Sequence, residues 1–427
     1  MTRGHRDLAA AAVAITVGLW ASSDPALLYP VYQARWGLDL VANTALFATY
    51  PLVLIVGLLC LGGLSDSIGR RRAMSIGLTL VAVGAALNVT VHAAWGAYLA
   101  RAVQGFGVSI MLPAAAALLV ESLAGAPRSA RLASTVNASS TATGTVVAFV
   151  VGGWFSDHSS DPASTAHWPL LVASSLTALS LARRAPDAGR AARRFAPAPP
   201  RVPAGPGRRP FLLGTIACSV GYSVAALFLS LGAHIGREIV HTPSALTEAL
   251  LLSLFPLANA TVPWLAYRLS ESASVALGGV VAAVGLVSLV ALGAHGGSIV
   301  FAVAAFWCGA GFSLLNRGGT ALVQISADDA RRAGALAAMS VAAYLTQAST
   351  ALLAGATSQR LGLQAAISVY SPAVALTALT AAGVVLTRRA RARASTACVS
   401  PSSPTCSATL PRRQGSTRLP CDTPATP

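Results

Sequence analysis

Charged side chains are scarce in this sequence of 427 residues, where aspartate, glutamate, lysine and arginine together make up 10%. A soluble domain carries about 25%, so the composition argues against a water-soluble fold. Apolar residues reach 54% and the mean hydropathy is +0.64. Because a bilayer-spanning helix needs about 20 mostly uncharged residues, the composition predicts a helical membrane protein with the lipid bilayer as its surroundings.

Lysine is absent, so every basic side chain apart from histidine is an arginine. We interpret this as the codon bias of a GC-rich genome and expect a bacterial source. The net charge is +16, but the arginines form short clusters between apolar runs. They do not build the aromatic-interleaved basic face of a nucleic-acid-binding protein, and no nucleic-acid partner is expected.

Signatures of enzymes, metal sites and ATP use are also missing. The sequence has no Walker loop, its seven histidines form no H-x-x-x-H pair, and its six cysteines show neither metal-ligand spacing nor a disulfide framework. We therefore predict no enzymatic activity, no metal and no cofactor. A transporter with this sequence would draw on an ion gradient, with protons as the expected ion.

Long apolar segments rich in glycine, alanine, serine and threonine recur along the chain, as expected where membrane helices pack closely. They predict an all-α membrane protein with twelve transmembrane helices. The segments cover residues 7–30, 41–64, 73–93, 95–120, 131–154, 166–182, 211–233, 245–267, 274–294, 298–323, 333–357 and 362–387.

The arginines predict the orientation in the membrane, since cytoplasmic loops carry an excess of positive charge. With the N-terminus inside, 25 of the 30 arginines fall in inner segments. Arg35, Arg237 and Arg360 fall in outer loops, and Arg101 and Arg317 fall within spans. Both termini are therefore predicted to be cytoplasmic, in a multi-pass protein of the cytoplasmic membrane.

An arginine-, proline- and alanine-rich stretch, residues 183–210, divides the chain into two parts with six spans each. We predict an N-terminal half (1–182), a basic cytoplasmic central loop (183–210), a C-terminal half (211–387) and a disordered cytoplasmic tail (388–427). Such halves are typical of parallel repeats that hold a substrate in a central cavity near the bilayer midplane.

The loop after the second span reads Gly62-Gly63-Leu64-Ser65-Asp66-Ser67-Ile68-Gly69-Arg70-Arg71-Arg72. Glycines permit a tight turn, and an acid beside arginines can form a charge network that latches helices in one conformation. The alternative is a basic loop that only sets topology.

This loop resembles the signature of the major facilitator superfamily, G-x-x-x-D-R/K-x-G-R/K-R/K. Gly62, Asp66, Gly69, Arg70 and Arg71 match it, whereas Ser67 replaces a basic residue. The resemblance covers the whole chain in span count and central loop. It implies an alternating-access transporter of small molecules, expected to work as a monomer, in which these five residues form a latch that stabilises the outward-facing state.

Arg101 lies early in the fourth span, in a stretch that resembles the family pattern R-x-x-Q-G-x-G through Arg101, Gln104, Gly105 and Gly107. The resemblance implies a role in proton coupling. An arginine within a bilayer is costly and is a functional hypothesis by default. The alternative is that its side chain extends to the membrane surface.

Asp24, followed by Pro25 in the first span, is the predicted partner of Arg101. Both residues are expected about six residues below the outer face, which is a depth of about 9 Å at 1.5 Å per residue. Their charges could pair across the cavity and couple protonation to conformation, because burial and a nearby arginine shift a carboxyl group's proton affinity in opposite directions. The alternative is that Asp24 marks a helix end that faces water.

The fifth span carries Gly144, Gly152 and Gly153 in a stretch that resembles the antiporter signature G-x-x-x-G-P-x-x-G-G. Ala148-Phe149 replaces the Gly-Pro pair, which weakens the assignment as an exporter. We expect these glycines, with Gly105 and Gly107, to serve helix packing.

Several polar and aromatic side chains within spans are candidates for lining the substrate cavity. Alternatively, the aromatic side chains belong to interfacial belts, and the side chain of Arg317 extends to the inner membrane surface. The candidates are Trp20, Tyr50, Gln104, Tyr222, Asn316 and Arg317.

Three classes of function follow. The first is a secondary active transporter that exports a drug or secondary metabolite in exchange for protons. The second is a symporter or facilitator that imports a sugar, organic acid or amino acid. The third is a membrane sensor or scaffold that does not transport, although a latch has no purpose without alternating states.

Overall fold

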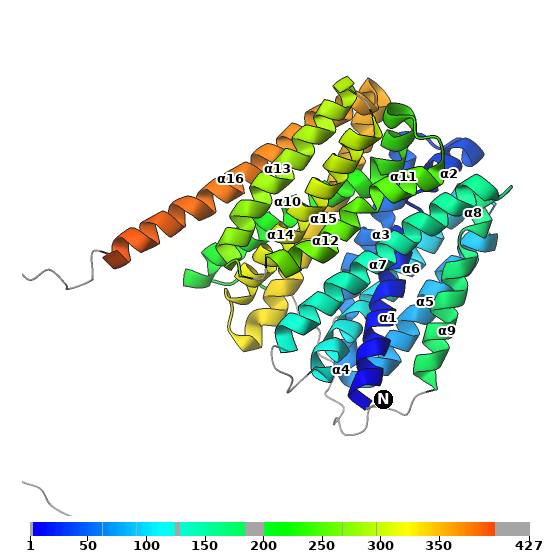
Figure 1. The fold of residues 1–427 in the computed structure, drawn as a ribbon. Coiled ribbons are helices and arrows are strands. Elements are labelled where there is room, and N and C mark those ends of the chain that lie inside the picture. The colour runs from blue at the N-terminus through cyan, green and yellow to red at the C-terminus, as the bar shows by residue number, and fades with distance from the viewer. Residues whose placement is uncertain are drawn as a thin grey trace, which may run out of the picture. The chain divides into compact units, whose positions relative to one another are not determined.

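The computed structural model describes residues 3–61, 63–90, 92–123, 129–183, 200–266, 268–295 and 297–397. Within these ranges the chain forms helices and turns and no β-strand (Figure 1). The described residues up to Thr387 form one compact unit, and those from Arg388 onward belong to a second unit. Most of the predicted central loop, most of the predicted tail, and Gly62 lie outside the described residues.

The described residues of the first half form nine helices. They are α1 (Arg3–Ser23), α2 (Tyr29–Trp36), α3 (Leu40–Leu61), α4 (Leu64–Ile68), α5 (Arg70–Thr90), α6 (Ala94–Ser122), α7 (Ser129–His158), α8 (Pro162–Thr165) and α9 (Trp168–Ala182).

The second half begins at Arg208, inside the stretch predicted as central loop. Its elements are α10 (Arg208–Ile235), a π-helical turn (Gly236–Val240), α11 (Ala245–Leu252), α12 (Leu254–Leu265), α13 (Glu271–His295), α14 (Ser298–Gln324), α15 (Asp329–Leu361) and α16 (Leu363–Ala397).

Ten helical segments of the described chain are long and apolar enough to cross a membrane, with α11 and α12 together forming one of them. The remaining two predicted spans correspond to α1 and α9. Helix α9 has 15 residues, and α1 opens with Arg3, Arg6 and Asp7. The helical membrane fold is confirmed, whereas the count of twelve spans stays a prediction.

The first predicted span, 7–30, is interrupted. Helix α1 ends at Ser23, and the turn that follows contains Asp24 and Pro25 before α2 begins at Tyr29. Proline has no N–H to donate and clashes with the preceding helical turn, which explains the break. The break places a carboxylate at a helix end.

Glycine 69 separates α4 from α5 and has a backbone φ of +97°. Side chains with a Cβ rarely adopt this conformation. The glycine of the loop motif is therefore required by the sharp change of direction between the two helices.

The helix ends lie at two opposite ends of the bundle. One, which we call the arginine-rich end, carries the start of α5 with Arg70, the start of α10 with Arg208, and the start of α15 with Arg331. The other, the arginine-poor end, carries α2, α8 and the start of α11 (Figure 1).

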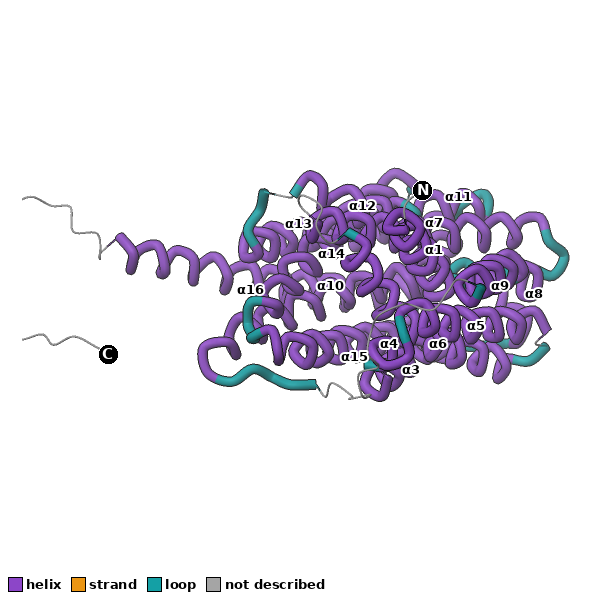
Figure 2. The backbone as a smooth tube through the Cα atoms, turned by 90° about the horizontal axis from the view of Figure 1, so that it is seen from below, coloured by secondary structure: helices purple, strands orange, loops and turns teal. Residues whose placement is uncertain are grey.

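The two halves lie side by side, with α3 against α15 and α7 against α11 and α12 (Figure 2). Glycines permit close approach within and between the halves. A Cβ on Gly107 would lie 2.5 Å from the carbonyl oxygen of Gly77 in α5, and one on Gly105 would lie 2.6 Å from that of Tyr50 in α3.

Helix α7 uses its glycines in the same way. A Cβ on Gly144 would lie 2.2 Å from the carbonyl oxygen of Thr16 in α1, and one on Gly153 would lie 2.6 Å from that of Ala245 in α11. Gly152 leaves more room, with the Cβ of Leu27 at 3.2 Å. The glycines at the ends of this series face different halves of the protein.

Candidate functional site

Asp24 is buried in the turn between α1 and α2, with 3% of its surface exposed. Its Oδ2 contacts Nδ1 of His167, which lies directly before α9 and is fully buried. The other ring nitrogen, Nε2 of His167, lies 2.8 Å from the hydroxyl of Tyr32 in α2. His167 thus joins Asp24 and Tyr32, which lie more than 130 positions before it, in one buried chain of polar contacts.

This arrangement can hold a proton and respond to its loss. A neutral His167 that donates its Nδ1 proton to the Asp24 carboxylate accepts at Nε2 from the Tyr32 hydroxyl. When a proton binds, the imidazole becomes a donor at both nitrogens, and the Tyr32 oxygen must accept instead. Because buried charges require paired and hydrogen-bonded partners, a change of protonation here rearranges contacts among three segments.

Arg101 in α6 is buried, with 1% of its surface exposed, and binds the end of α1. Its Nη1 donates to the carbonyl oxygen of Ala21 at 2.8 Å, and its Nη2 donates to that of Ser22 at 3.0 Å. The last carbonyls of a helix lack intrahelical partners and carry partial negative charge. Arg101 therefore caps α1 immediately before the turn that holds Asp24.

Two further contacts fix the Arg101 guanidinium. Nη1 lies 3.2 Å from Oε1 of Gln104, and the guanidinium carbon lies 4.5 Å above the centre of the Tyr50 ring. A cation over an aromatic face is stabilised by the ring's electron distribution. Arg101 consequently links α6, α3 and the end of α1.

The expected direct pairing of Asp24 with Arg101 is not found, since the ion pair of Asp24 among the described residues is with His167. Arg101 instead binds backbone oxygens two and three residues before Asp24. The two charges nevertheless lie near the same turn. A similar depth in the membrane brings two charges to the same region, but it does not specify which groups each charge contacts.

The predicted cavity residues fall into separate environments. In the first half, Trp20 and Tyr50 are buried, and Gln104 is fully buried against α5, where its Cγ would touch a Cβ on Gly84. In the second half, the ring of Tyr222 lies 5.0 Å from that of Tyr344.

At the arginine-rich side of α14, Arg317 donates to the Ser274 hydroxyl at 2.6 Å and to the carbonyl oxygen of Leu269 at 3.4 Å, both near the start of α13. Asn316 beside it is partly buried. That Asn316 and Arg317 meet substrate stays a prediction.

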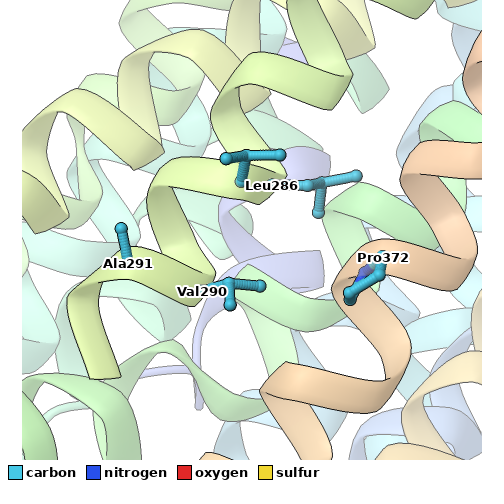
Figure 3. A pocket seen from close by; sticks show the side chains of 5 residues that line it. Leu286, Val290, Ala291 and Pro372 are labelled. Carbon is cyan, nitrogen blue, oxygen red and sulfur yellow. The ribbon is translucent and has the colours of Figure 1, made fainter. Parts of the chain in front are cut away.

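A pocket of about 260 Å³ lies elsewhere, between α13 and the region of Pro372 in α16 (Figure 3). Its lining is formed by Leu286, Val287, Val290, Ala291 and Pro372. None of the predicted cavity residues contributes to it. Its wholly apolar walls suit a lipid-facing groove better than a site for polar recognition.

The loop between α3 and α5 forms a charge network at the arginine-rich end. Arg70 Nη2 lies 2.5 Å from Oδ1 of Asp66, its Nε lies 3.4 Å from Oε1 of Glu121 in α6, and its Nη1 also contacts the Ser65 hydroxyl. Arg71 Nη2 lies 2.7 Å from Oδ1 of Asp7 in α1. Each of these contacts stays within the first half.

The sequence profile of the Major Facilitator Superfamily matches residues 9–345. The chain belongs to this superfamily. No curated protein sequence matches it significantly.

Two solved transporters have a similar fold. The nucleoside transporter NupG superposes with a TM-score of 0.68 and 13% identity, over 89% of this chain and 99% of that one. The peptide transporter POT, solved in complex with sulfate, superposes with a TM-score of 0.74 and 14% identity, over 92% of this chain and 95% of that one. This superfamily member is accordingly a membrane transport protein and not an enzyme.

In this superfamily member, the ion pairs of Arg70 and Arg71, in and after the loop between α3 and α5, differ in burial. The Asp66 side chain is 51% exposed, so its pair with Arg70 contributes little to stability. The pair of Arg71 with Asp7 is largely buried. Removing one partner of a buried pair leaves the other charge uncompensated.

We expect Arg71→Gln to lower the free energy of unfolding by about 3 kcal/mol. The neighbouring Arg72→Gln is the matched control, because Arg72 is exposed, and its effect should stay within about 0.5 kcal/mol. Thermal unfolding of the purified protein in detergent measures both. Equal melting temperatures for the two variants would contradict a structural role for the buried pair.

The two halves of the superfamily fold are joined at the arginine-poor end by side chains that bind backbone. Asp157 at the end of α7 accepts from the N–H groups of Ala245 at 2.8 Å and Leu246 at 2.9 Å, at the start of α11. The carboxylate thus caps a helix of the other half.

A second connection at the same end involves Asp39. Its Oδ1 accepts from the N–H of Ala42 at 2.7 Å, and its Oδ2 accepts from Gln359 of α15 at 2.9 Å. These two hydrogen bonds lower the pKa of Asp39, so the carboxylate stays ionised at neutral pH. This connection is therefore not sensitive to pH in the physiological range.

Sequence reasoning missed His167 and Tyr32 as members of the site. A signal existed for His167, since it is a histidine at the start of the predicted span 166–182, at the same end of the bundle as Asp24. Tyr32 lies just after the predicted first span, 7–30, where hydropathy indicates a loop. Its role depends on α2, a short helix that hydropathy does not reveal.

Proposed function

We propose that this chain is a proton-coupled secondary transporter that exports a small organic molecule across the cytoplasmic membrane by alternating access. The observation that carries this proposal is the buried contact chain of Asp24, His167 and Tyr32, beside a helix end held by Arg101. Ionisable groups buried within a membrane bundle mark ion pathways and proton relays by default.

The site can transmit a change of protonation to the other half. Tyr32 belongs to α2, and α2 contacts α10 of the second half. Tyr32 also shares a buried apolar cluster with Phe228 and Leu231 of α10. When proton loss changes the hydrogen bond at the Tyr32 hydroxyl, the position of α2 against α10 can shift with it.

The distribution of arginine supports an orientation in which the arginine-rich end faces the cytoplasm. Under this orientation, the contacts of Asp157 and Asp39 close the outer end, and the proton site lies near the outer face. The external medium supplies the proton, and a site at this depth binds it before the outer end closes.

Export is proposed because the stretch around Arg101 resembles a pattern linked to proton coupling and the glycines of α7 resemble part of the antiporter signature. The replacement of its Gly-Pro pair by Ala148-Phe149 weakens the second argument. Two proteins of similar fold transport nucleosides and peptides, so small polar organic molecules belong in the first substrate panel. A proton symporter that imports a sugar, organic acid or amino acid is the competing outcome.

The test reconstitutes the protein in liposomes and records substrate-induced proton movement with a panel of lipophilic cations, nucleosides, peptides, sugars and organic acids. We expect substrate and protons to move in opposite directions. Movement in the same direction would replace export with symport, and the absence of any proton movement with a transported substrate would refute coupling.

Variants of the contact chain locate the coupling. Asp24→Asn and His167→Gln should each reduce substrate-induced proton movement by about tenfold or more, because hydrogen bonds to charged groups contribute about 1.5–3 kcal/mol. Substrate exchange at equal pH should persist. The matched controls are Asp161→Asn and His158→Gln, which alter an exposed acid and an exposed histidine at the same end of the bundle. Unchanged proton movement in Asp24→Asn would disprove the assignment.

A further inference from the structure

Glu248 in the first turn of α11 is a carboxylate in an unusual position. The side chain is fully buried, and neither Oε1 nor Oε2 has a hydrogen-bond partner within the described part of the chain. The nearest opposite charge is Nε of Arg237, 3.7 Å from Oε2, beyond normal hydrogen-bond distance.

The π-helical turn Gly236–Val240 helps to enclose it. A Cβ on Gly236 would lie 2.6 Å from Cγ of Glu248, so only glycine lets the backbone pass this close. The turn also carries Arg237, which is partly exposed, and Glu238, whose Oε1 lies 3.5 Å from Nδ1 of the buried His234.

Helix α7 of the first half packs on the helix that carries Glu248. Helix α7 packs on α11 through Gly153, and Asp157 caps the start of α11 with a second negative charge one turn from Glu248. Helix α12 has no ionisable side chain. The one arginine of α14, Arg317, is bonded to Ser274 and Leu269. Arg237 is therefore the basic group beside this carboxyl group, with Asp157 as its acidic neighbour. His234 and Glu238 pair with each other.

A buried carboxylate without hydrogen bonds is costly, and the neutral acid is the form that such a site favours. Separation of α7 from α11 would admit water to Glu248 and remove the Asp157 cap from the start of α11. Water and the Arg237 side chain could then both stabilise the ionised form.

We propose that Glu248 is a proton-binding residue that controls opening at the arginine-poor end. It holds a proton while α7 packs on α11 and releases that proton to water when the halves separate there. Each opening converts one carboxylic acid to one carboxylate with release of one proton. Low pH therefore favours the conformation in which this end is closed, and high pH favours the open one. This proposal goes beyond the proton site of Asp24 and assigns a second group to the second half.

The experiment measures the distance between spin labels on cysteines introduced at Ser160 and Pro243, one in each half at this end, with native cysteines replaced. Detergent-solubilised full-length protein carrying Asp24→Asn is used, so that the first site does not contribute. The ratio of open to closed populations should rise at least about tenfold between about pH 5.5 and about pH 8.5, since one linked proton gives up to tenfold per pH unit.

Glu248→Gln should abolish this dependence and hold the end closed at every pH, because glutamine imitates the neutral acid. Glu238→Gln is the control, because Glu238 lies in the neighbouring π-helical turn and its side chain is exposed. This variant should keep the pH dependence of the label distance. A pH response retained by Glu248→Gln, or absent from the parent protein, would overturn the proposal. Neither result would bear on the coupling role of Asp24, which is tested by proton movement in liposomes.

Discussion

Arg101→Lys is expected to reduce transport by about 50-fold or more, although it keeps the positive charge. The guanidinium donates to the carbonyl oxygens of Ala21 and Ser22 from two nitrogens and also contacts Gln104 and the Tyr50 ring. An ammonium group is a single point charge that cannot reproduce this planar set of contacts. The loss of one or two charged hydrogen bonds, at about 1.5–3 kcal/mol each, corresponds to a factor of this size.

The effect on transport should arise from the α1–α2 turn. Without the cap, the end of α1 is free to shift, and Asp24 shifts with it relative to His167. Initial rates of substrate uptake into liposomes measure the effect, and size-exclusion chromatography confirms that the variant is folded. Arg35→Lys provides the control, because Arg35 is a more exposed arginine at the same end, paired with Asp161.

A lysine variant with normal rates would show that the cap on α1 is dispensable. A variant with reduced rates but normal proton coupling per substrate would show that Arg101 positions the helix without affecting the proton site. Only a loss of both rate and coupling supports the connection between the helix cap and the contact chain of Asp24.

The sequence was sufficient for the fold class and the family because both depend on local features. Apolar runs identify membrane helices from hydropathy alone, and the loop with Asp66, Gly69 and Arg70 is contiguous. The positive φ of Gly69 explains why one of its glycines is needed. These inferences required no knowledge of how distant segments pack.

The partners of buried charges were not predictable in the same way. Asp24 and His167 are separated by 143 positions, and their contact depends on the turn after α1 and on the short helix α8. Glu248 lies near the start of the predicted span 245–267, where hydropathy alone indicates a membrane interface. Its side chain instead packs against Gly236 of a π-helical turn, on a helix that contacts the other half, and hydropathy reveals neither feature.

Gly153→Val is expected to hold the arginine-poor end open and to reduce transport by about tenfold or more. A Cβ at this position would lie 2.6 Å from the carbonyl oxygen of Ala245 and 2.8 Å from the Cβ of Ala249. The nearer atom belongs to the backbone of α11, so α7 and α11 must separate to admit a side chain. Overpacking of this kind costs about 1–3 kcal/mol, and the closed state would bear that cost.

The label pair at Ser160 and Pro243 measures the separation directly. Gly383→Val is the matched control, because a Cβ on Gly383 in α16 meets nothing within 4 Å, and its distances and transport should equal those of the parent. A closed distance distribution in Gly153→Val would contradict the role of this glycine in closing the end.

The same variant connects the packing of α7 with the protonation of Glu248. If the bulky side chain keeps the halves apart, Glu248 remains in contact with water and stays ionised near neutral pH. Acidification should then protonate it without closing the end, so the label distance should lose its pH dependence while remaining long. Glu248→Gln loses the dependence in the closed state instead. A long label distance in Gly153→Val and a short one in Glu248→Gln, both independent of pH, are expected only if protonation of Glu248 is coupled to the contact between α7 and α11.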